Sequence, residues 1–438
     1  MDIQTTTLLI AAGMVLLLAA GLPLAFVTGV VAMVVALVQF GPASLTLIAS
    51  RTYTLMSEFV LVAVPMFLLM ASILERSGVA RDLFRAMHIW AGEPARRARR
   101  ADHGGRGADG GDDRHHRRRD RTARPDRAAA DAAREVRPQP RHRHHLRRRI
   151  LGTMIPPSIV LIVYGLTANV SIGDLFVATV VPGLLLAALY IAYIVGLCHL
   201  RPEAGPLAPA EDRAIPLREK IALLRNLVLP IAVAAWVLGS IYAGIASVSE
   251  AAGMGVVGAL GTAAVRRELK WAMLAAALRQ TMGTCGMLLW LTFGANALIG
   301  VYNLMGGTRF LQGMITGLPL SPLMIVVVMM LVLVVLGMFM DWIGITLLAM
   351  PIFVPAVVEL GFDPIWFGIL FCMNMQISYL TPPFGPAAFY LKGVAPTEIT
   401  LNQIFAALWP FIALQVVGLA LVLAFPALAL WLPAKVFG

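Results

Sequence analysis

The chain contains 438 residues, of which 59% are hydrophobic and 13% are charged. Soluble globular domains carry roughly 25% charged residues, so this composition excludes a soluble enzyme. Several apolar stretches reach the ~20 residues needed to cross a bilayer, where every backbone polar group must be paired internally. The sequence therefore predicts an all-α polytopic membrane protein, and we expect neither enzyme activity nor a cofactor or metal centre.

The amino-terminal part, residues 1–92, is expected to form the first portion of a membrane-embedded repeat. Two apolar spans fall within residues 5–50, and a shorter apolar segment at 59–74 ends in a polar turn at Gly78. No basic region precedes the first span, so no cleavable signal peptide is predicted. Arg81 follows the turn and is expected to anchor the end of a hairpin, with substrate contact as its alternative role.

Residues 93–150 differ sharply from the rest of the chain. The formal net charge is +11, and this tract alone holds 19 of the 35 Lys and Arg residues, all Arg, and 6 of the 8 His. Such a tract is typical of a solvated loop or of an arm that binds RNA. However, it contains no aromatic residue and no Lys, and its His residues do not fall at zinc-ligand spacing with any Cys. We therefore expect no nucleic-acid partner and no metal site here.

A third interpretation is that this tract is translated out of frame. If the last two bases of each codon begin the true codon, Arg and Gly conceal mainly Gly, Ala and Val, while Asp and His conceal Ile, Met or Thr. Residues 108–132 can then be decoded as a continuous apolar helix. A chain made as printed would place 19 Arg where spans belong, at about 3 kcal/mol each near the bilayer centre. We predict that a frameshift replaces a transmembrane helix here, and that the printed chain neither inserts correctly nor transports.

Membrane sequence resumes after the tract. Residues 151–198 complete the first repeat with a short interrupted segment and a full span, and residues 199–225 form a hydrophilic, basic linker. Residues 226–438 form the second repeat, whose first two spans are followed by Arg266 and Arg267. Both basic clusters then lie on one side of the membrane, which the positive-inside rule makes cytoplasmic.

The second repeat is expected to contain five further apolar segments, at 281–305, 321–340, 342–358 (closed by prolines), 364–392 (interrupted) and 403–433 (a single long span). Arg309 is expected to be an anchor like Arg81, again with substrate contact as the alternative. Glu250 is expected to start a helix that Ser247 caps, with a proton-relay role as the alternative.

Two sets of matches relate the halves of the chain. The Pro-Pro pair at 156–157 recurs at 382–383, an offset of 226 residues, and Gly78 recurs as Gly306 at an offset of 228. From the glycine to the first proline is 78 residues in the first half and 76 in the second. The Arg-rich tract therefore has the length of its counterpart, and the chain consists of two homologous halves.

Each half carries its Pro-Pro pair inside an apolar segment. Proline removes a backbone donor and stops the helix, so nearby carbonyls lose their partners. In lipid such a break persists only where protein, water or a bound cation satisfies those groups. Paired interrupted segments are typical of a transporter site near the midplane, where freed carbonyls bind a monovalent cation and half-helix amino ends favour an anionic substrate. The alternative is that each Pro-Pro pair merely kinks a packed helix.

Several polar or small residues lie close to the breaks. Asp341, with Gly344 and Thr346 after it, is expected to form the other half of the second site. A carboxylate in an apolar run is costly unless it faces a cavity or a partner, and Asp341 could equally cap a helix at the end of a span. Ser158 and Gly385, just behind the two breaks, are candidates for substrate binding.

Five short motifs follow one another in a characteristic order: Val-Pro-Met-Phe at 64–67, Ile-Pro-Pro-Ser at 155–158, Ile-Tyr-Ala-Gly at 241–244, Ser-Glu-Ala at 249–251 and Thr-Pro-Pro at 381–383. Together they resemble the large, DctM-like membrane subunit of tripartite ATP-independent periplasmic (TRAP) transporters, from about residue 5 to 430 outside the tract. The resemblance implies a multi-pass protein of the bacterial inner membrane. It also implies two inverted-topology repeats with re-entrant helical hairpins and an elevator-type motion.

The same resemblance implies a sodium-coupled importer of organic acids, such as C4-dicarboxylates or related carboxylates. Two Na⁺ sites are expected, each where a hairpin tip meets a helix break. The first would use Gly152, Thr153, Ile155 and Pro156, with its other half inside the Arg-rich tract. The second would use Gly337, Asp341, Gly344, Thr346, Thr381 and Pro382. Besides the lipid bilayer, the implied partners are a small four-helix membrane subunit and a periplasmic solute-binding protein that delivers the small carboxylate substrate.

Two alternatives remain at this point. The first is a related ion-coupled carrier of organic anions that works alone. The second is a non-transporting membrane scaffold whose Arg-rich loop binds nucleic acid or acidic lipid. Resequencing the gene separates the scaffold from a carrier, and sodium-dependent uptake with and without a binding protein separates the two carriers.

Overall fold

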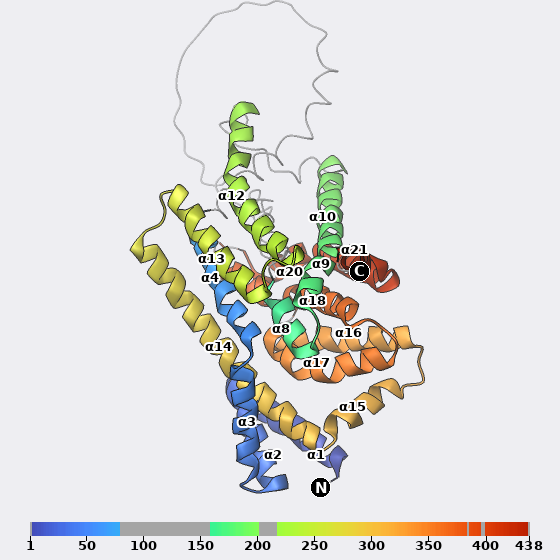
Figure 1. Ribbon diagram of the computed structural model, residues 1–438. Helices are drawn as coiled ribbons and strands as arrows, with labels where there is room; N and C mark the ends of the chain where they lie inside the picture. The colour runs from blue at the N-terminus through green and yellow to red at the C-terminus, as the bar shows by residue number, and fades with distance from the viewer. Residues whose placement is uncertain (1, 79–157, 201–216, 383–384, 396–398, 437–438) are drawn as a thin grey trace, which may run out of the picture.

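The computed structural model describes residues 2–78, 158–200, 217–382, 385–395 and 399–436 (Figure 1). Every regular element within these stretches is a helix. Seven helical segments are long and apolar enough to cross a membrane. Large apolar side chains such as Val257, Trp290 and Leu331 are exposed on them, as expected of surfaces that face lipid. The predicted all-α polytopic class is confirmed.

The amino-terminal helices form an arm with the long helix α14 (Trp271–Leu304). They are α1 (Ile3–Ala19), α2 (Leu24–Phe40) and α3 (Ser44–Met56). Gly21 and Gly41 separate them, and both have a positive φ that is costly for other residues. α2 lies along α14 at close range, since a Cβ added to Gly294 would lie 2.6 Å from the carbonyl oxygen of Ala25. Small residues at such a crossing let two membrane helices approach closely.

A second group of helices follows the arm in the chain. It contains η1 (Phe59–Val62), α4 (Ala63–Arg76), α12 (Leu217–Tyr242) and α13 (Val248–Val265). α4 packs against α13 and α14. Its last turn lies near the start of α14, because Arg76 Nη2 donates to Gln280 Oε1 at 2.7 Å, so the two helices run antiparallel. Gly78 and Gly306, which the repeat aligns, follow these two helices with φ values of 81° and 77°.

The core of the molecule is built around α18. The group contains α8 (Ile159–Ala168), α9 (Ile172–Ala178), α10 (Val180–Leu200), α18 (Pro364–Leu380), α20 (Leu401–Ala424) and α21 (Ala427–Val436). Of the 17 residues of α18, 14 are buried, so this helix is central rather than lipid-facing. The ring of Tyr164 in α8 fills the space beside Gly368, and its hydroxyl donates to the carbonyl oxygen of Pro364 at 2.6 Å. These contacts fix α8 to α18.

The remaining helices form a hairpin and the second half of the broken segment. They are α15 (Gly307–Thr316), α16 (Pro322–Phe339), α17 (Trp342–Glu359) and α19 (Pro386–Val394). α16 and α17 lie side by side (Figure 1), joined by only the two residues Met340 and Asp341. Their open end lies at α15, where Gln312 Nε2 donates to Glu359 Oε2 at 2.7 Å. The hairpin therefore enters and leaves on the same side.

Two predicted boundaries are wrong, those of α14 and of the span at 403–433, whereas the segment predicted at 342–358 agrees with α17 and only the role of its prolines differs. α14 begins ten residues earlier than the expected 281, at Trp271. α17 is not closed by Pro351 and Pro355 but continues through both to Glu359, because neighbouring helices can accommodate the lost backbone bonds. The expected single span at 403–433 is two helices, since Phe425 leaves the helical conformation before Pro426, as residues before proline tend to do.

Candidate functional site

Two chain breaks lie near each other, where the half-exposed tip of the α16–α17 hairpin packs against α18. α16 ends at Phe339, Met340 is extended, and the Asp341 side chain caps α17 by accepting from the Ile343 N–H at 3.2 Å. α18 ends at Leu380, and α19 begins only at Pro386. One turn before each break the helices touch: a Cβ added to Gly337 would lie 2.6 Å from Ser378 Oγ. The tip of the hairpin therefore packs directly against the broken helix.

Proline spacing explains why carbonyls are released at the second break. In an α-helix the carbonyl of residue i accepts from the N–H of residue i+4. For residues 378, 379 and 382 that position is a proline, which has no N–H. The Ser378 carbonyl instead accepts from the Thr381 N–H at 3.2 Å, in a tighter final turn. The Thr381 hydroxyl donates to the carbonyl oxygen of Ile377 at 2.6 Å, which leaves its own oxygen able to bind a cation.

A cavity of about 600 Å³ lies where these elements meet, and we call it the tip cavity. Asp341 and its neighbours line one side, and Tyr379, Pro386 and Tyr390 of the broken helix line another. Ile159, two residues after the first Pro-Pro pair, also faces it. The tip cavity is therefore lined by residues from the start of α8, from the helices on both sides of the second break and from the hairpin tip.

Of the second set of predicted cation-binding residues, Asp341 alone lines the tip cavity, and the others lie on the helices that flank the two breaks. Gly337, Asp341, Thr381 and Pro382 lie at the two breaks. Asp341 both caps a helix and faces the tip cavity, so the two roles weighed for it are combined. Gly344 and Thr346 lie behind the tip in α17, fully buried, with the Thr346 hydroxyl donating to the carbonyl oxygen of Trp342. Gly344 packs against Leu24 of α2.

The other predicted residues do not gather in the same way. Ser158 and Gly385 are buried at the starts of α8 and α19 and do not line the tip cavity themselves. Arg309 is exposed on α15 and lines neither of the two cavities found in the described part of the chain. Outside the described residues lie Arg81, Gly152, Thr153, Ile155, Pro156 and the tract at 93–150.

Glu250 has the structural role expected of it. Its carboxylate accepts from the Ser247 N–H at 2.8 Å, while Ser247 Oγ accepts from the Glu250 N–H at 3.3 Å. This reciprocal pair caps the start of α13. The capping geometry accounts for Glu250 without a relay.

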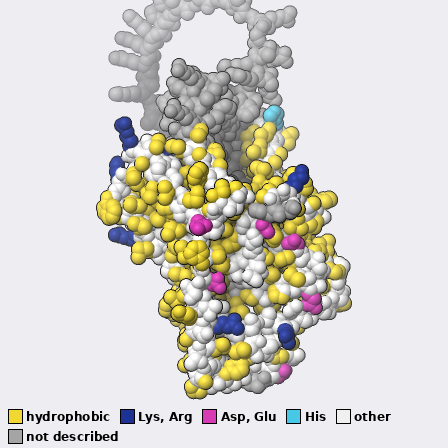
Figure 2. Space-filling model, in the orientation of Figure 1, with side chains coloured by type: hydrophobic (Ala, Val, Ile, Leu, Met, Phe, Trp, Pro, Cys, Tyr) yellow, Lys and Arg dark blue, Asp and Glu magenta, His cyan; other side chains and the backbone are white. Residues whose placement is uncertain are grey.

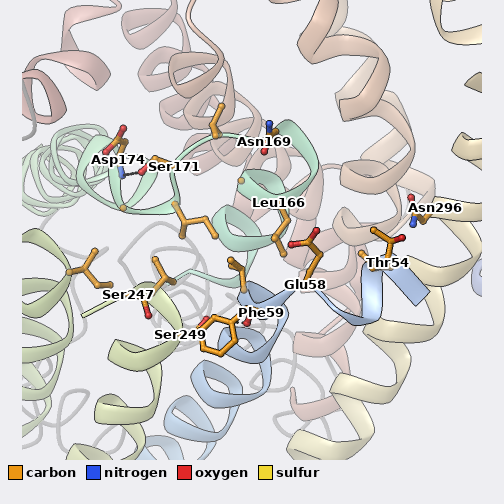
Figure 3. Close-up of a pocket in the computed structure, with 18 of the residues that line it drawn as sticks. Thr54, Glu58, Phe59, Leu166, Asn169, Ser171, Asp174, Ser247, Ser249 and Asn296 are labelled. Carbon is orange, nitrogen blue, oxygen red and sulfur yellow. Dashed lines mark hydrogen bonds between the residues drawn. The ribbon is translucent and has the colours of Figure 1, made fainter. Parts of the chain in front are cut away.

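A larger cavity of about 950 Å³, which we call the outer cavity, was not expected from the sequence. Its walls come from α3, the α8–α9 turn, the α12–α13 turn and α14, and Figure 3 shows Glu58, Asn169 and Asp174 around it. These polar residues are far apart in sequence and form no motif. Only the positive φ of 55° at Asn169, which ends α8, is a local feature that marks the site.

The distribution of basic residues indicates on which side of the membrane the outer cavity opens. Arg76, Arg266 and Arg267 lie where α4 and α13 end, and Arg266 Nε donates to the carbonyl oxygen of Ser77 at 2.9 Å. Basic side chains lie along the left edge of Figure 2, with others at the right and lower down, and acidic side chains are spread over the middle and lower parts of this face. The positive-inside rule makes the basic face cytoplasmic. The α12–α13 turn that lines the outer cavity lies at the far ends of both helices, so this cavity opens on the opposite face.

Comparison with known proteins agrees with this architecture. Residues 11–97 and 149–428 match the family model described as "Tripartite ATP-independent periplasmic transporter, DctM component". The C4-dicarboxylate TRAP transporter large permease protein DctM of Pseudomonas aeruginosa is 30% identical over 396 residues, 90% of this chain and 91% of that protein. The sialic acid TRAP transporter large permease protein SiaM of Vibrio cholerae is 29% identical over 293 residues, 66% of each.

A further relative differs in its length. The isethionate TRAP transporter permease protein DctMQ of Oleidesulfovibrio alaskensis is 30% identical over 282 residues, which cover 64% of this chain and 43% of that protein. The family model and the Pseudomonas relative together span most of the chain, including both sides of the tip cavity. This chain belongs to the DctM family, the large permease component of the tripartite ATP-independent periplasmic transporters.

Proposed function

We propose that this permease is the membrane subunit of a sodium-coupled secondary transporter that imports organic acids. The observation that supports the proposal is the tip cavity, which Asp341 of the hairpin tip and Tyr379 and Pro386 of the proline-broken helix line together. Carbonyl, hydroxyl and carboxylate oxygens suit a small hard cation, and discontinuous helices in transporters supply such ligands near the bilayer midplane. Family membership makes the chain a transporter permease of the bacterial inner membrane rather than an enzyme.

At the second site we assign the cation to the region between the two breaks. The ligands would come from the carbonyls at 378–382, the Thr381 hydroxyl and the Asp341 carboxylate. Gly337 lets α16 pack closely on the Ser378 side chain of α18, and the buried Thr346 holds the first turn of α17. The first site, at Gly152, Thr153, Ile155 and Pro156, stays a proposal from the sequence repeat.

The substrate is proposed to be a carboxylate. α17 and α19 both begin at the tip cavity, and helix amino ends carry partial positive charge that favours anions. Relatives are named for C4-dicarboxylates and sialic acid. A C4-dicarboxylate or a related organic acid is therefore the proposed class of solute.

The proposed partners are a small four-helix membrane subunit and a periplasmic solute-binding protein. The family is described as tripartite, which calls for two further components. The isethionate relative is a single permease named DctMQ, of which this chain matches 43%, consistent with a second membrane component in that protein.

We also propose that the gene encodes a membrane helix in place of the Arg-rich tract. The family match stops at residue 97 and resumes at 149, so the tract is the internal part that it leaves out. Resequencing should show two compensating frame changes that flank residues 93–150. An uninterrupted reading of the printed frame would end this part of the proposal.

Uptake into proteoliposomes tests the function directly. The full chain, expressed from its gene with the adjoining small subunit, should import succinate in the presence of the binding protein and an inward sodium gradient. Uptake indifferent to sodium would remove the cation from the proposal. Uptake that needs no binding protein would instead support the stand-alone carrier.

A further inference from the structure

Arg51 lies on the wall of the outer cavity and has no charged partner among the residues that the structure describes. Its stem lies across Gly300 of α14, where an added Cβ would lie 3.2 Å from Arg51 Nε. Its backbone carbonyl accepts from Asn296 Nδ2 at 3.3 Å. The guanidinium makes no hydrogen bond or ion pair within the described part of the chain. Two residues one turn apart on α14 therefore hold Arg51 in place while its charged group stays available.

The other charged groups of the cavities are acidic. Among the described residues that line the two cavities, Glu58, Asp174 and Asp341 are anionic and Arg51 is the sole cation. Glu58 lies beside Thr54 in Figure 3, and its carboxylate, like that of Asp174, has no partner within the described residues. The Asn169 amide faces the same space and can accept or donate.

This combination discriminates between kinds of acid. A guanidinium binds one carboxylate through two parallel hydrogen bonds, which are stronger than neutral ones. A second carboxylate on the same solute would meet Glu58 and Asp174 and be repelled, whereas hydroxyl or ammonium groups would donate to them. The cavity volume of about 950 Å³ admits a solute of this size.

We propose that the outer cavity captures a monocarboxylate that carries hydroxyl or ammonium groups, with Arg51 binding its carboxylate and Glu58 accepting from its donors. The site lies on the non-cytoplasmic face, ahead of the tip cavity. The inference rests on the proposed import of organic acids, and within that class it favours a hydroxy or amino monocarboxylate over the C4-dicarboxylates.

Cysteine protection tests the site without requiring transport. In the protein expressed from its gene, with Cys198, Cys285 and Cys372 replaced by alanine, Thr54→Cys places one thiol beside Arg51. A membrane-impermeant maleimide is applied from outside, at constant ionic strength and without sodium, with gluconate, succinate or sorbitol as the probe. Gluconate should slow labelling, succinate should do so at a concentration about ten-fold higher, and sorbitol should not protect.

Variants of the lining identify the groups responsible. Arg51→Gln should raise the half-protecting gluconate concentration by about 10- to 100-fold, as the loss of charge-assisted hydrogen bonds predicts. Arg309→Gln, at an exposed Arg that lines neither cavity, is the matched control and should change nothing. Glu58→Gln should improve protection by succinate, because a repelling charge is removed.

Three results would overturn the proposal. The first is that gluconate still protects the thiol in the Arg51→Gln variant. The second is that succinate protects as well as gluconate in the Thr54→Cys protein that carries no further change. The third is that the thiol does not react with the maleimide applied from outside. Because protection needs neither sodium nor uptake, its failure is separate from failure of the transport proposal. Protection that persists while sodium-driven uptake is absent would count against the coupling ion alone.

Discussion

Substituting Gly337 by alanine tests whether contact between hairpin tip and broken helix matters for function. The new Cβ would lie 2.6 Å from Ser378 Oγ, about 1 Å inside normal van der Waals separation. Both residues lie in buried parts of packed helices, so α16 must move away from α18. Overpacking of this kind costs about 1–3 kcal/mol. We expect Gly337→Ala to lower the temperature of half-inactivation and to raise the sodium concentration for half-maximal uptake.

A compensating change makes the experiment specific. Ser378→Gly removes the clashing atoms, and the next atom near the new Cβ would be Met375 Cε at an ordinary 3.6 Å. Alone, Ser378→Gly should cost about 0.5–1.5 kcal/mol, from helix propensity and the lost hydrogen bond to Asn374. At the middle of both ranges, the double variant should be more stable than Gly337→Ala by about 1 kcal/mol.

The assay compares half-inactivation temperature and sodium-dependent succinate uptake for both single variants and the double variant. Gly261→Ala in α13 is the control, because a Cβ there meets nothing within 4 Å. If Gly337→Ala behaves like this control, or if Ser378→Gly fails to restore it, the contact does not position the tip and the reasoning is refuted.

Three further outcomes are expected. Asp341→Asn should keep the helix cap, since Asn caps as well as Asp, yet raise the half-saturating sodium concentration at least about ten-fold in uptake assays; an unchanged value would remove Asp341 from the cation site. Gly294→Ala should lower the half-inactivation temperature, because its Cβ would lie 2.6 Å from a backbone oxygen of α2. Gly29→Ala is the control, since its Cβ would lie 3.9 Å from the nearest atom and should leave that temperature unchanged. Equal losses of thermal stability in the two variants would contradict the packing argument. The chain translated as printed should fail to insert, measured by protease protection, and normal insertion would refute the frame hypothesis.

Features with a strong local cause could be predicted from the sequence. Helices end near Gly21, Gly41 and Thr381 because the glycines adopt a positive φ and the prolines after Thr381 lack a backbone N–H. The juxtaposition of Gly337 with the second break was expected from the family resemblance. Ser378, which makes that contact, was missed because it is an ordinary residue of a buried helix.

Features that depend on tertiary packing could not be predicted. α17 runs through Pro351 and Pro355 because its neighbours compensate, and no local pattern reports that. The outer cavity is equally invisible in the sequence, since Arg51 and Asn296 meet only after α3 packs on α14. A single Arg in an apolar stretch has the same sequence surroundings whether it anchors a helix at the membrane surface or binds a ligand.

The attachment of α8 to α18 has a consequence for stoichiometry. Tyr164 ties α8, which begins just after the first Pro-Pro pair, to α18, which ends just before the second, so these two helices move as one rigid body. Ions bound at the start of α8 and at the end of α18 would therefore move together. A variant that loosens this tie, such as Tyr164→Ala, should let the number of ions per solute drift from an integer, a quantity that reversal potentials measure.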